Sequence, residues 1–211
     1  MKRIIQIDEK LVRSNLINLK QLIFEVTEKC NLNCKYCGLS RQLYKTYNDR
    51  NKRDLSFEKA KLIIDYLLNL WKDNQVSDTT SRFALSFYGG EPLINMPLIK
   101  KIIDYIEQSE ITGRKILYNI TTNAVILDKH MDFLVEKNFI LHISLNGDEL
   151  SQSYRVDHSG KNSFNQIFRN VKLLQRTHPK YVVTMDEYST GNYNGILQLH
   201  LKDFLMKRSF S

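Results

Sequence analysis

Short apolar runs alternate with longer amphipathic segments along this chain, and this alternation constrains its fold more than any other feature. Strand-like runs lie at 22–26, 83–88, 115–121, 139–145 and 181–185. The segments between them carry apolar side chains at helical intervals of three and four residues. Strands separated by helices require right-handed crossovers. The pattern therefore predicts an α/β fold, a parallel sheet covered by helices that is either open or curved toward a barrel.

Several residues between these runs are suited to begin helices. Ser56 can cap a helix over 57–71, and Pro97 fits the first turn of a second helix. Asp128 and Ser163 are candidate caps of a third and a fourth helix.

Length and composition predict a single domain over residues 1–211. The chain is 42% hydrophobic and 26% charged, which suits a globular protein with one core. The recognisable core spans 20–185. Residues 186–211 stay ambiguous, because ILQLHL alternates like a strand whereas ILQLHLKDFLMK is equally compatible with a helix. No stretch has the apolar continuity of a secretion signal or a membrane span, so we expect a cytoplasmic protein without a membrane partner.

The chain carries a formal net charge of +8, from 31 Lys and Arg against 23 Asp and Glu. Part of the excess lies in RQLYKTYNDRNKR at 41–53, which reads as a solvated loop. Because the chain has no recognisable RNA-binding module, the charge alone does not predict a nucleic-acid partner.

All three cysteines of the chain, Cys30, Cys34 and Cys37, lie in the stretch CNLNCKYC directly after the first strand. The residues between them are polar, so packing as small apolar side chains is a poor explanation. Structural zinc normally takes four ligands, and no histidine is near in the sequence; a distant fourth ligand keeps zinc as an alternative. Three thiolates also suit three corners of a four-iron cluster, leaving the fourth corner open. Such a site would lie on the face where α/β folds build active sites.

The spacing C-x3-C-x2-C with Tyr36 before the last cysteine resembles the signature of radical S-adenosylmethionine (SAM) enzymes. The resemblance implies a partial (β/α)6 TIM-like barrel and a [4Fe-4S] cluster on the three cysteines. It also implies that the methionyl group of SAM occupies the fourth iron.

Three further motifs support the resemblance, because each follows a successive predicted strand. YGGEP at 88–92 is similar to the GGEP motif, in which Gly89, Gly90 and Glu91 would receive the SAM amino group. TTN and SLNG follow the next two strands. The usual S-x-D-G pattern has Asn146 in place of Asp here, and the His-Asp pair that often precedes the arginine is absent. The remaining residues expected to bind SAM by this resemblance are Tyr36, Thr122, Asn123, Ser144, Asn146 and Arg155.

The resemblance is strongest to the peptide-maturing and anaerobic sulfatase-maturing branch. It implies reductive cleavage of SAM to a 5′-deoxyadenosyl radical that abstracts hydrogen from a peptide or protein. It further implies a reductant such as flavodoxin or ferredoxin. No general base can be named from the sequence, so the catalytic residues stay unknown. A non-catalytic metal- or cluster-binding accessory protein and an RNA-modifying radical SAM enzyme are the alternatives. Without a clear sixth strand or a cysteine after Cys37, we also expect a C-terminally shortened form that holds the cluster but does not modify a peptide; a truncated inactive fragment is a further alternative.

Overall fold

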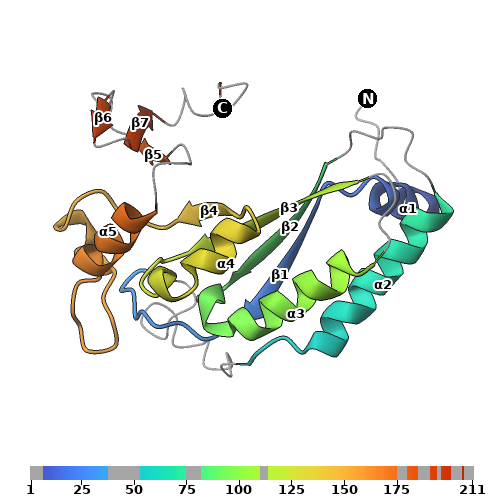
Figure 1. Cartoon of the computed structure of the whole chain (residues 1–211), viewed down its shortest axis with the longest axis horizontal. Coiled ribbons are helices and arrows are strands. Elements are labelled where there is room, and N and C mark those ends of the chain that lie inside the picture. The colour runs from blue at the N-terminus through green and yellow to red at the C-terminus, as the bar shows by residue number, and fades with distance from the viewer. Residues whose placement is uncertain are drawn as a thin grey trace.

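The computed structural model of the chain describes residues 7–37, 53–74, 82–109, 114–174, 180–184, 191–193, 196–200 and residue 206. Figure 1 shows the elements in place. The helices are α1 (Glu9–Ile17), α2 (Phe57–Asp73), α3 (Met96–Glu107), α4 (Met131–Glu136) and α5 (Phe164–Leu173). The strands are β1 (Gln21–Thr27), β2 (Arg82–Gly89), β3 (Lys115–Thr122), β4 (Ile140–Ile143), β5 (Lys180–Thr184), β6 (Gly191–Tyr193) and β7 (Ile196–His200). Short 3-10 helices are η1 (Pro92–Asn95), η2 (Leu127–Lys129) and η3 (Ser151–Tyr154).

The central feature is a four-stranded sheet in the order β1-β2-β3-β4, in which every neighbouring pair is parallel. Phe24 of β1 pairs with Phe87 of β2, which in turn pairs with Ile120 of β3. A segment that contains a helix connects each strand to the next parallel strand. The carboxyl ends of all four strands therefore lie at one edge of the sheet. The α/β class and the open, partial-barrel arrangement predicted from the sequence are confirmed.

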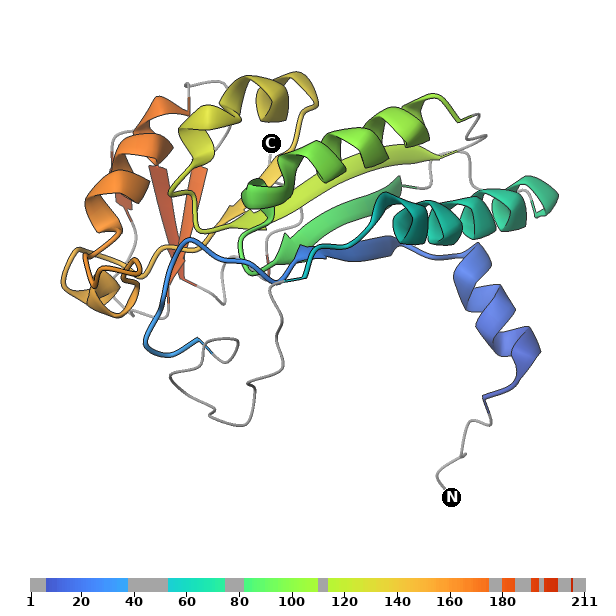
Figure 2. The ribbon, with the colours of Figure 1, turned by 90° about the horizontal axis from the view of Figure 1, so that it is seen from below.

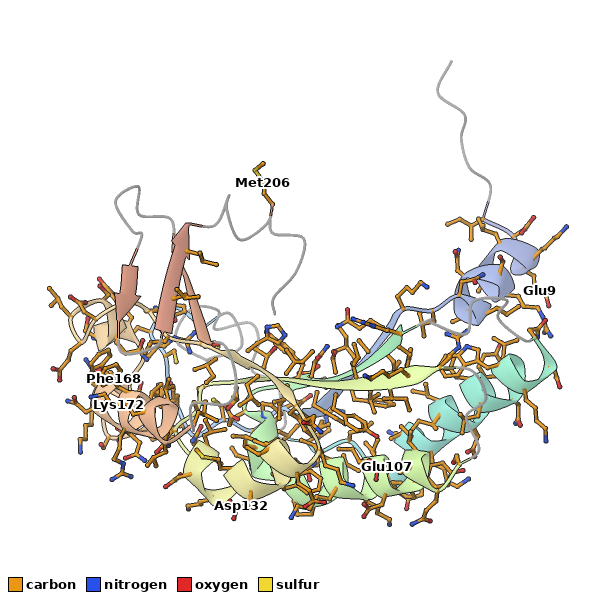
Figure 3. The ribbon with its side chains drawn as sticks, turned by 45° about the horizontal axis from the view of Figure 1, so that its top comes forward. Glu9, Glu107, Asp132, Phe168, Lys172 and Met206 are labelled. Atoms are coloured by element: carbon orange, nitrogen blue, oxygen red, sulfur yellow. The ribbon has the colours of Figure 1, made fainter. Side chains whose placement is uncertain are left out.

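Helices α2, α3 and α4 cover one face of this sheet, as Figure 3 shows with Glu107 and Asp132 on the helical side. The core between sheet and helices is built from fully buried aliphatic and aromatic side chains. Its centre comprises Val26, Leu85, Phe87, Ile99, Ile102, Ile103, Ile120 and Leu134. The alternating burial along each strand follows directly from the period of two in β structure.

The opposite face of the sheet is largely open. Ile23, Tyr88 and Ile140 are 57%, 47% and 45% exposed. Parallel sheets normally have both faces covered. This face is therefore partly exposed and mixed in character, with apolar Ile23 and Ile140 beside polar Gln21, Ser86 and Asn119.

Of the three predicted helix caps, Ser56 is confirmed, Asp128 is wrong, and Ser163 has the predicted position without the capping hydrogen bond. Ser56 caps α2 by accepting from the backbone N–H of Lys59 at 3.4 Å, and Pro97 lies in the first turn of α3. Asp128, in contrast, lies inside η2, and α4 begins after His130 without a side-chain cap. Ser163 stands at the N-cap position of α5, but its hydroxyl donates to the Arg155 carbonyl at 2.7 Å instead of capping the helix.

The fifth predicted strand forms but does not join the main sheet. β5 pairs in parallel with β7, and β6 pairs antiparallel with β7, in a separate three-stranded sheet. The expected extension of the first sheet by a fifth strand is therefore wrong in this structure. Within the ambiguous stretch, Ile196–His200 forms β7.

The helix α1 was not predicted. Asp8 caps it through the Leu11 backbone N–H at 2.7 Å, yet none of its residues is buried. Only Leu16 of α1 packs against the core, and it is partly buried, so the helix has too small an apolar face to be predicted from periodicity. Over the described ranges, no helix is long and apolar enough to cross a membrane. The basic stretch at 41–53 lies outside the described residues except for Arg53.

Candidate functional site

The turn after β2 binds directly to the start of the cysteine loop. The Gly90 backbone N–H donates to the Thr27 carbonyl at 2.9 Å, and the Glu91 N–H donates to the Lys29 carbonyl at 2.8 Å. Gly89 has φ +143°, and a Cβ on either glycine would lie 2.3 Å from a backbone oxygen, of Thr27 or of Lys29. Only glycine permits this approach. The two glycines therefore hold the first two strand ends together.

Glu91 is fully buried at the next position and joins β2 to β3. Its Oε1 accepts from the Thr122 hydroxyl at 2.7 Å and from the Leu93 N–H at 3.1 Å. Its Oε2 accepts from the Asn123 backbone N–H at 2.7 Å. Burial raises the pKa of Glu91, while these hydrogen bonds oppose the rise. In this structure the carboxylate anchors the two strand ends.

Asn123 reaches from the end of β3 to the first cysteine. Its Nδ2 donates to Asn31 Oδ1 at 2.8 Å and lies 3.8 Å from Cys30 Sγ, within hydrogen-bond distance for sulfur. The Leu32 backbone N–H also donates to Cys30 Sγ, at 3.5 Å. The Ser144 backbone N–H donates to the Thr122 carbonyl at 2.9 Å and so adds the fourth strand end.

Tyr36 meets Asn146 and Arg155, although Asn146 lies 110 residues after it in the sequence. Asn146 Nδ2 donates to the Tyr36 hydroxyl at 3.0 Å, and Arg155 Nε donates to Asn146 Oδ1 at 3.1 Å. The Arg155 guanidinium lies 5.6 Å from the centre of the Tyr36 ring. An Asn can both donate to Tyr36 and accept from Arg155, whereas an ionised Asp could only accept.

The cysteine loop is fixed along its length by the segment after η3. The Asn33 and Lys35 backbone N–H groups donate to the carbonyls of Val156 and Tyr154, at 2.7 and 2.9 Å. The ring Nε2 of His158 is 3.0 Å from the Cys30 carbonyl oxygen. In Figures 1 and 2 the blue chain after β1 accordingly runs toward the orange segment before α5.

The three thiols lie close enough to influence one another electrostatically. Burial raises the pKa of Cys30 to about 11 and raises that of Cys34, while the Arg155 charge opposes the rise at Cys34. Over the described ranges, no three His, Cys, Asp or Glu side chains are already arranged to hold a metal ion. The three thiols are therefore near one another, but they are not arranged as ligands of one metal ion. Metal sites commonly reach their final geometry only when the ion binds.

The donor set fits an iron–sulfur cluster better than a closed metal site. Three sulfur ligands with nearby amide N–H donors are the surroundings such clusters use. The structure also corrects one premise of the sequence analysis, because His158, absent from the sequence neighbourhood, lies beside Cys30. Its Nε2 is occupied by the Cys30 carbonyl, which leaves only Nδ1 as a ligand atom.

Sequence reasoning missed Asn31, Gln152 and His158. Gln152 is fully buried; it accepts from the Asn146 backbone N–H at 2.7 Å and donates to the Ser163 hydroxyl at 3.2 Å. It therefore supports the loop that presents Asn146. The one available signal was that Asn31 stands between two of the three cysteines in CNLNC.

A pocket of about 300 Å³ hollows the open face of the sheet. Gln21 Nε2 and Asn119 Nδ2 both donate to the Ser86 hydroxyl oxygen, at 2.8 and 3.3 Å, across its floor. The lining residues are Gln21, Ile23, Ser86, Phe87, Tyr88, Asn119, Ile120, Thr121 and His142. Uncharged hydrogen-bonding groups and apolar side chains are thus mixed, as in sites that bind organic ligands.

Comparison with known proteins identifies relatives for most of the chain. Residues 24–192 match the family model described as the Radical SAM superfamily. An uncharacterised protein of Methanocaldococcus jannaschii is 35% identical over 79% of this chain and 52% of its own length. The cysteine-type anaerobic sulfatase-maturating enzyme of Clostridium novyi is 28% identical over 83% of this chain and 46% of its own. The chain therefore spans about half the length of these curated relatives.

A solved structure shares the fold. Native anSMEcpe with bound AdoMet superposes with a TM-score of 0.61 at 22% identity, covering 74% of this chain and 41% of that one.

Proposed function

The chain belongs to the radical SAM superfamily, whose members use a four-iron cluster and SAM, and from this premise we propose that it binds both and acts in the maturation of a peptide or protein. One observation carries the proposal. The cysteine loop, the Gly89–Gly90 turn and the Tyr36–Asn146–Arg155 group are joined through hydrogen bonds at the carboxyl ends of four adjacent parallel strands. Such edges are where α/β folds bind their ligands.

Each part of this edge has a proposed role. Cys30, Cys34 and Cys37 would hold the cluster, which supplies the electron for reductive cleavage of SAM when both are bound. The backbone of Gly89 and Gly90, with Glu91, would receive the SAM amino group. Ser144 and Arg155 would bind its carboxylate, for which a guanidinium fork is well suited.

The remaining predicted residues would orient the rest of SAM. Thr122 and Asn123 fix the backbone at the end of β3 through Glu91, and Tyr36 and Asn146 position Arg155. The pocket on the open face of the sheet, lined by uncharged polar and apolar groups, would receive the organic substrate. Among these groups no general base is assigned.

A peptide or protein substrate is proposed because the Clostridium novyi relative is a sulfatase-maturating enzyme. The chain would receive electrons from a reductant such as flavodoxin or ferredoxin. It would act in the cytoplasm, where a reducing environment keeps three clustered cysteines as thiols. We propose further that residues 1–211 form one domain.

Anaerobic reconstitution with iron and sulfide tests the cluster. We expect about four irons and four sulfides per chain, with the electron paramagnetic resonance (EPR) spectrum of the reduced cluster changing when SAM is added. Cys34→Ala should lose the iron and the brown colour. Binding of zinc in place of iron, or a Cys34→Ala variant that keeps iron and sulfide, would overturn the assignment.

His158→Ala separates an open cluster from a closed zinc site. If three cysteines suffice, the variant keeps its iron and its response to SAM. Loss of metal from this variant would instead make His158 the fourth ligand of a Cys3His site.

A further inference from the structure

The orientation of the Asn123 side chain is fixed by the backbone. Its Oδ1 accepts from the Val125 N–H at 3.0 Å, so the opposite end of the amide must be Nδ2. That nitrogen faces Asn31 Oδ1 at 2.8 Å and Cys30 Sγ at 3.8 Å. Asn123 is therefore a donor toward the cysteine loop.

This fixes the orientation of Asn31 in turn. Its Oδ1 accepts from Asn123, and turning the amide over would set two N–H groups against each other. Asn31 Nδ2 is consequently a donor. It is buried and has no hydrogen-bond partner among the residues that the structure describes. A buried donor without an acceptor costs free energy, which a ligand with an acceptor atom would recover.

Asn123, which orients Asn31, is itself held in place by Glu91. The Asn123 N–H donates to Glu91, which is fully buried and also holds Thr122. Cys30 Sγ already receives N–H groups from Leu32 and Asn123. Asn31 follows Cys30 directly, and its Oδ1 lies 4.0 Å from Cys30 Sγ, so its unpaired Nδ2 belongs to a side chain that adjoins the proposed cluster site. A thiolate or sulfide is a chemically suited acceptor for this N–H.

We infer that Asn31, held in place by Asn123, donates a hydrogen bond to a sulfur atom of the iron–sulfur cluster and raises its reduction potential; this inference rests on the proposed cluster site. Hydrogen bonds to the sulfurs stabilise the reduced cluster, which carries one more negative charge. Asn31 therefore makes the cluster easier to reduce.

Two variants of Asn31 test the inference in the anaerobically reconstituted chain. Asn31→Asp keeps the acceptor for Asn123 but removes the donor, and Asn31→Leu removes the donor without adding charge. At the wild-type midpoint potential, we expect the ratio of reduced to oxidised cluster to fall roughly tenfold in both, a shift of about 59 mV for one electron. Pulsed EPR after exchange into heavy water should detect fewer deuterons coupled to the cluster in both variants.

Asn165→Leu is the control. Asn165 is exposed on α5 and its amide donates to Glu149 Oε1 at 2.9 Å, so this variant removes an amide donor outside the proposed site. Its potential and deuteron couplings should equal those of the wild type. A lower potential in Asn31→Asp alone, or unchanged deuteron couplings in both Asn31 variants, would overturn the inference. Failure of the wild-type chain itself to bind iron would instead refute the proposed function.

Discussion

Glu91 stabilises the folded chain in addition to belonging to a motif that resembles a SAM-binding motif. The resemblance assigns it to the SAM amino group, yet it is fully buried and accepts from Thr122, Leu93 and Asn123. Removal of its carboxylate would leave these donors without acceptors inside the protein. We therefore expect its substitution to affect the folded state even when no cofactor is present.

The stability of the chain without cofactor should fall when Glu91 is replaced. Three buried donors lose their acceptor in Glu91→Ala, and we expect a loss of about 3 kcal/mol in the free energy of unfolding. Urea denaturation followed by circular dichroism measures it. Glu136→Ala, at an exposed helix position, is the control and should stay within about 0.5 kcal/mol of the wild type. Equal urea midpoints for Glu91→Ala and the wild type would contradict the structural role.

Arg155 should contribute binding energy for SAM directly. A charge-assisted hydrogen bond contributes about 1.5–3 kcal/mol, so Arg155→Ala should weaken SAM binding by roughly 10- to 100-fold. Calorimetry on the reconstituted protein measures the affinity. Arg169→Ala serves as the control, because this arginine is exposed and pairs only weakly with Asp128. If both variants bind SAM like the wild type, Arg155 is not a ligand.

The sequence predicted the residues of the site that sit next to strand ends, and missed those that depend on distant pairing. Cys30 and Glu91 follow apolar runs, so their common edge could be inferred from parallel topology. Asn31 and His158 belong to the candidate site only through contacts between residues that are 92 and 128 positions apart in the sequence. No local sequence pattern encodes such contacts.

Among the elements, the long amphipathic helices and the central strands were predictable. The capping of the helix starts and the pairing of the later strands were not. The Ser56 hydroxyl accepts from the Lys59 backbone N–H and caps α2, whereas the Ser163 hydroxyl bonds to the Arg155 carbonyl and the Gln152 amide. Tertiary hydrogen bonds thus override a local capping preference. β5 likewise has a strand-like sequence, but its partner β7 lies in the stretch whose periodicity was ambiguous.

The junction between η2 and α4 should make stability depend on pH through His130. Burial, followed by the charges of Lys100 and Lys129, lowers the pKa of His130 below its ordinary value of 6.5. Below about pH 6.5 the unfolded chain therefore binds more protons at this residue than the folded chain does. The contribution of His130 to the free energy of unfolding is fully present above the unfolded-state pKa and is lost as the pH falls through the folded-state pKa.

Thermal unfolding at several pH values tests this dependence. From about pH 7.5 to about pH 5.5, the melting temperature of the wild type should fall more than that of His130→Gln, which cannot be protonated. His142→Gln is the control, because His142 is exposed on β4. Parallel pH profiles of the wild type and His130→Gln would rule out this contribution.

At the scale of the whole molecule, the exposed face of the four-stranded sheet carries several partly exposed apolar side chains. Ile23 and Ile140 project from a parallel sheet whose other face is fully packed. Exposed apolar area of this kind marks a surface that binds a ligand, another part of a protein or another chain. The chain spans about half the length of its curated relatives, so partners of the whole protein stay proposals.

A hydrophobic dye should bind to this face in the isolated chain. We expect fluorescence of anilinonaphthalene sulfonate to rise on binding and to fall in the double variant Ile23→Lys, Ile140→Lys. The single variant Leu62→Lys, at a position 72% exposed on α2, controls for a change in surface charge. Equal dye binding by the double variant and the wild type would show that the sheet face is not the dye site.

The attachment of the cysteine loop to the segment around His158 sets an order of events during synthesis. The contact between Cys30 and His158 spans 128 residues. At about 10 residues per second, the ribosome needs on the order of ten seconds to make the second partner after the first. Until then the backbone carbonyls that hold the loop do not exist. The cysteines are therefore synthesised before the segment that holds their loop, and the loop can take this conformation only after synthesis has passed the fourth strand.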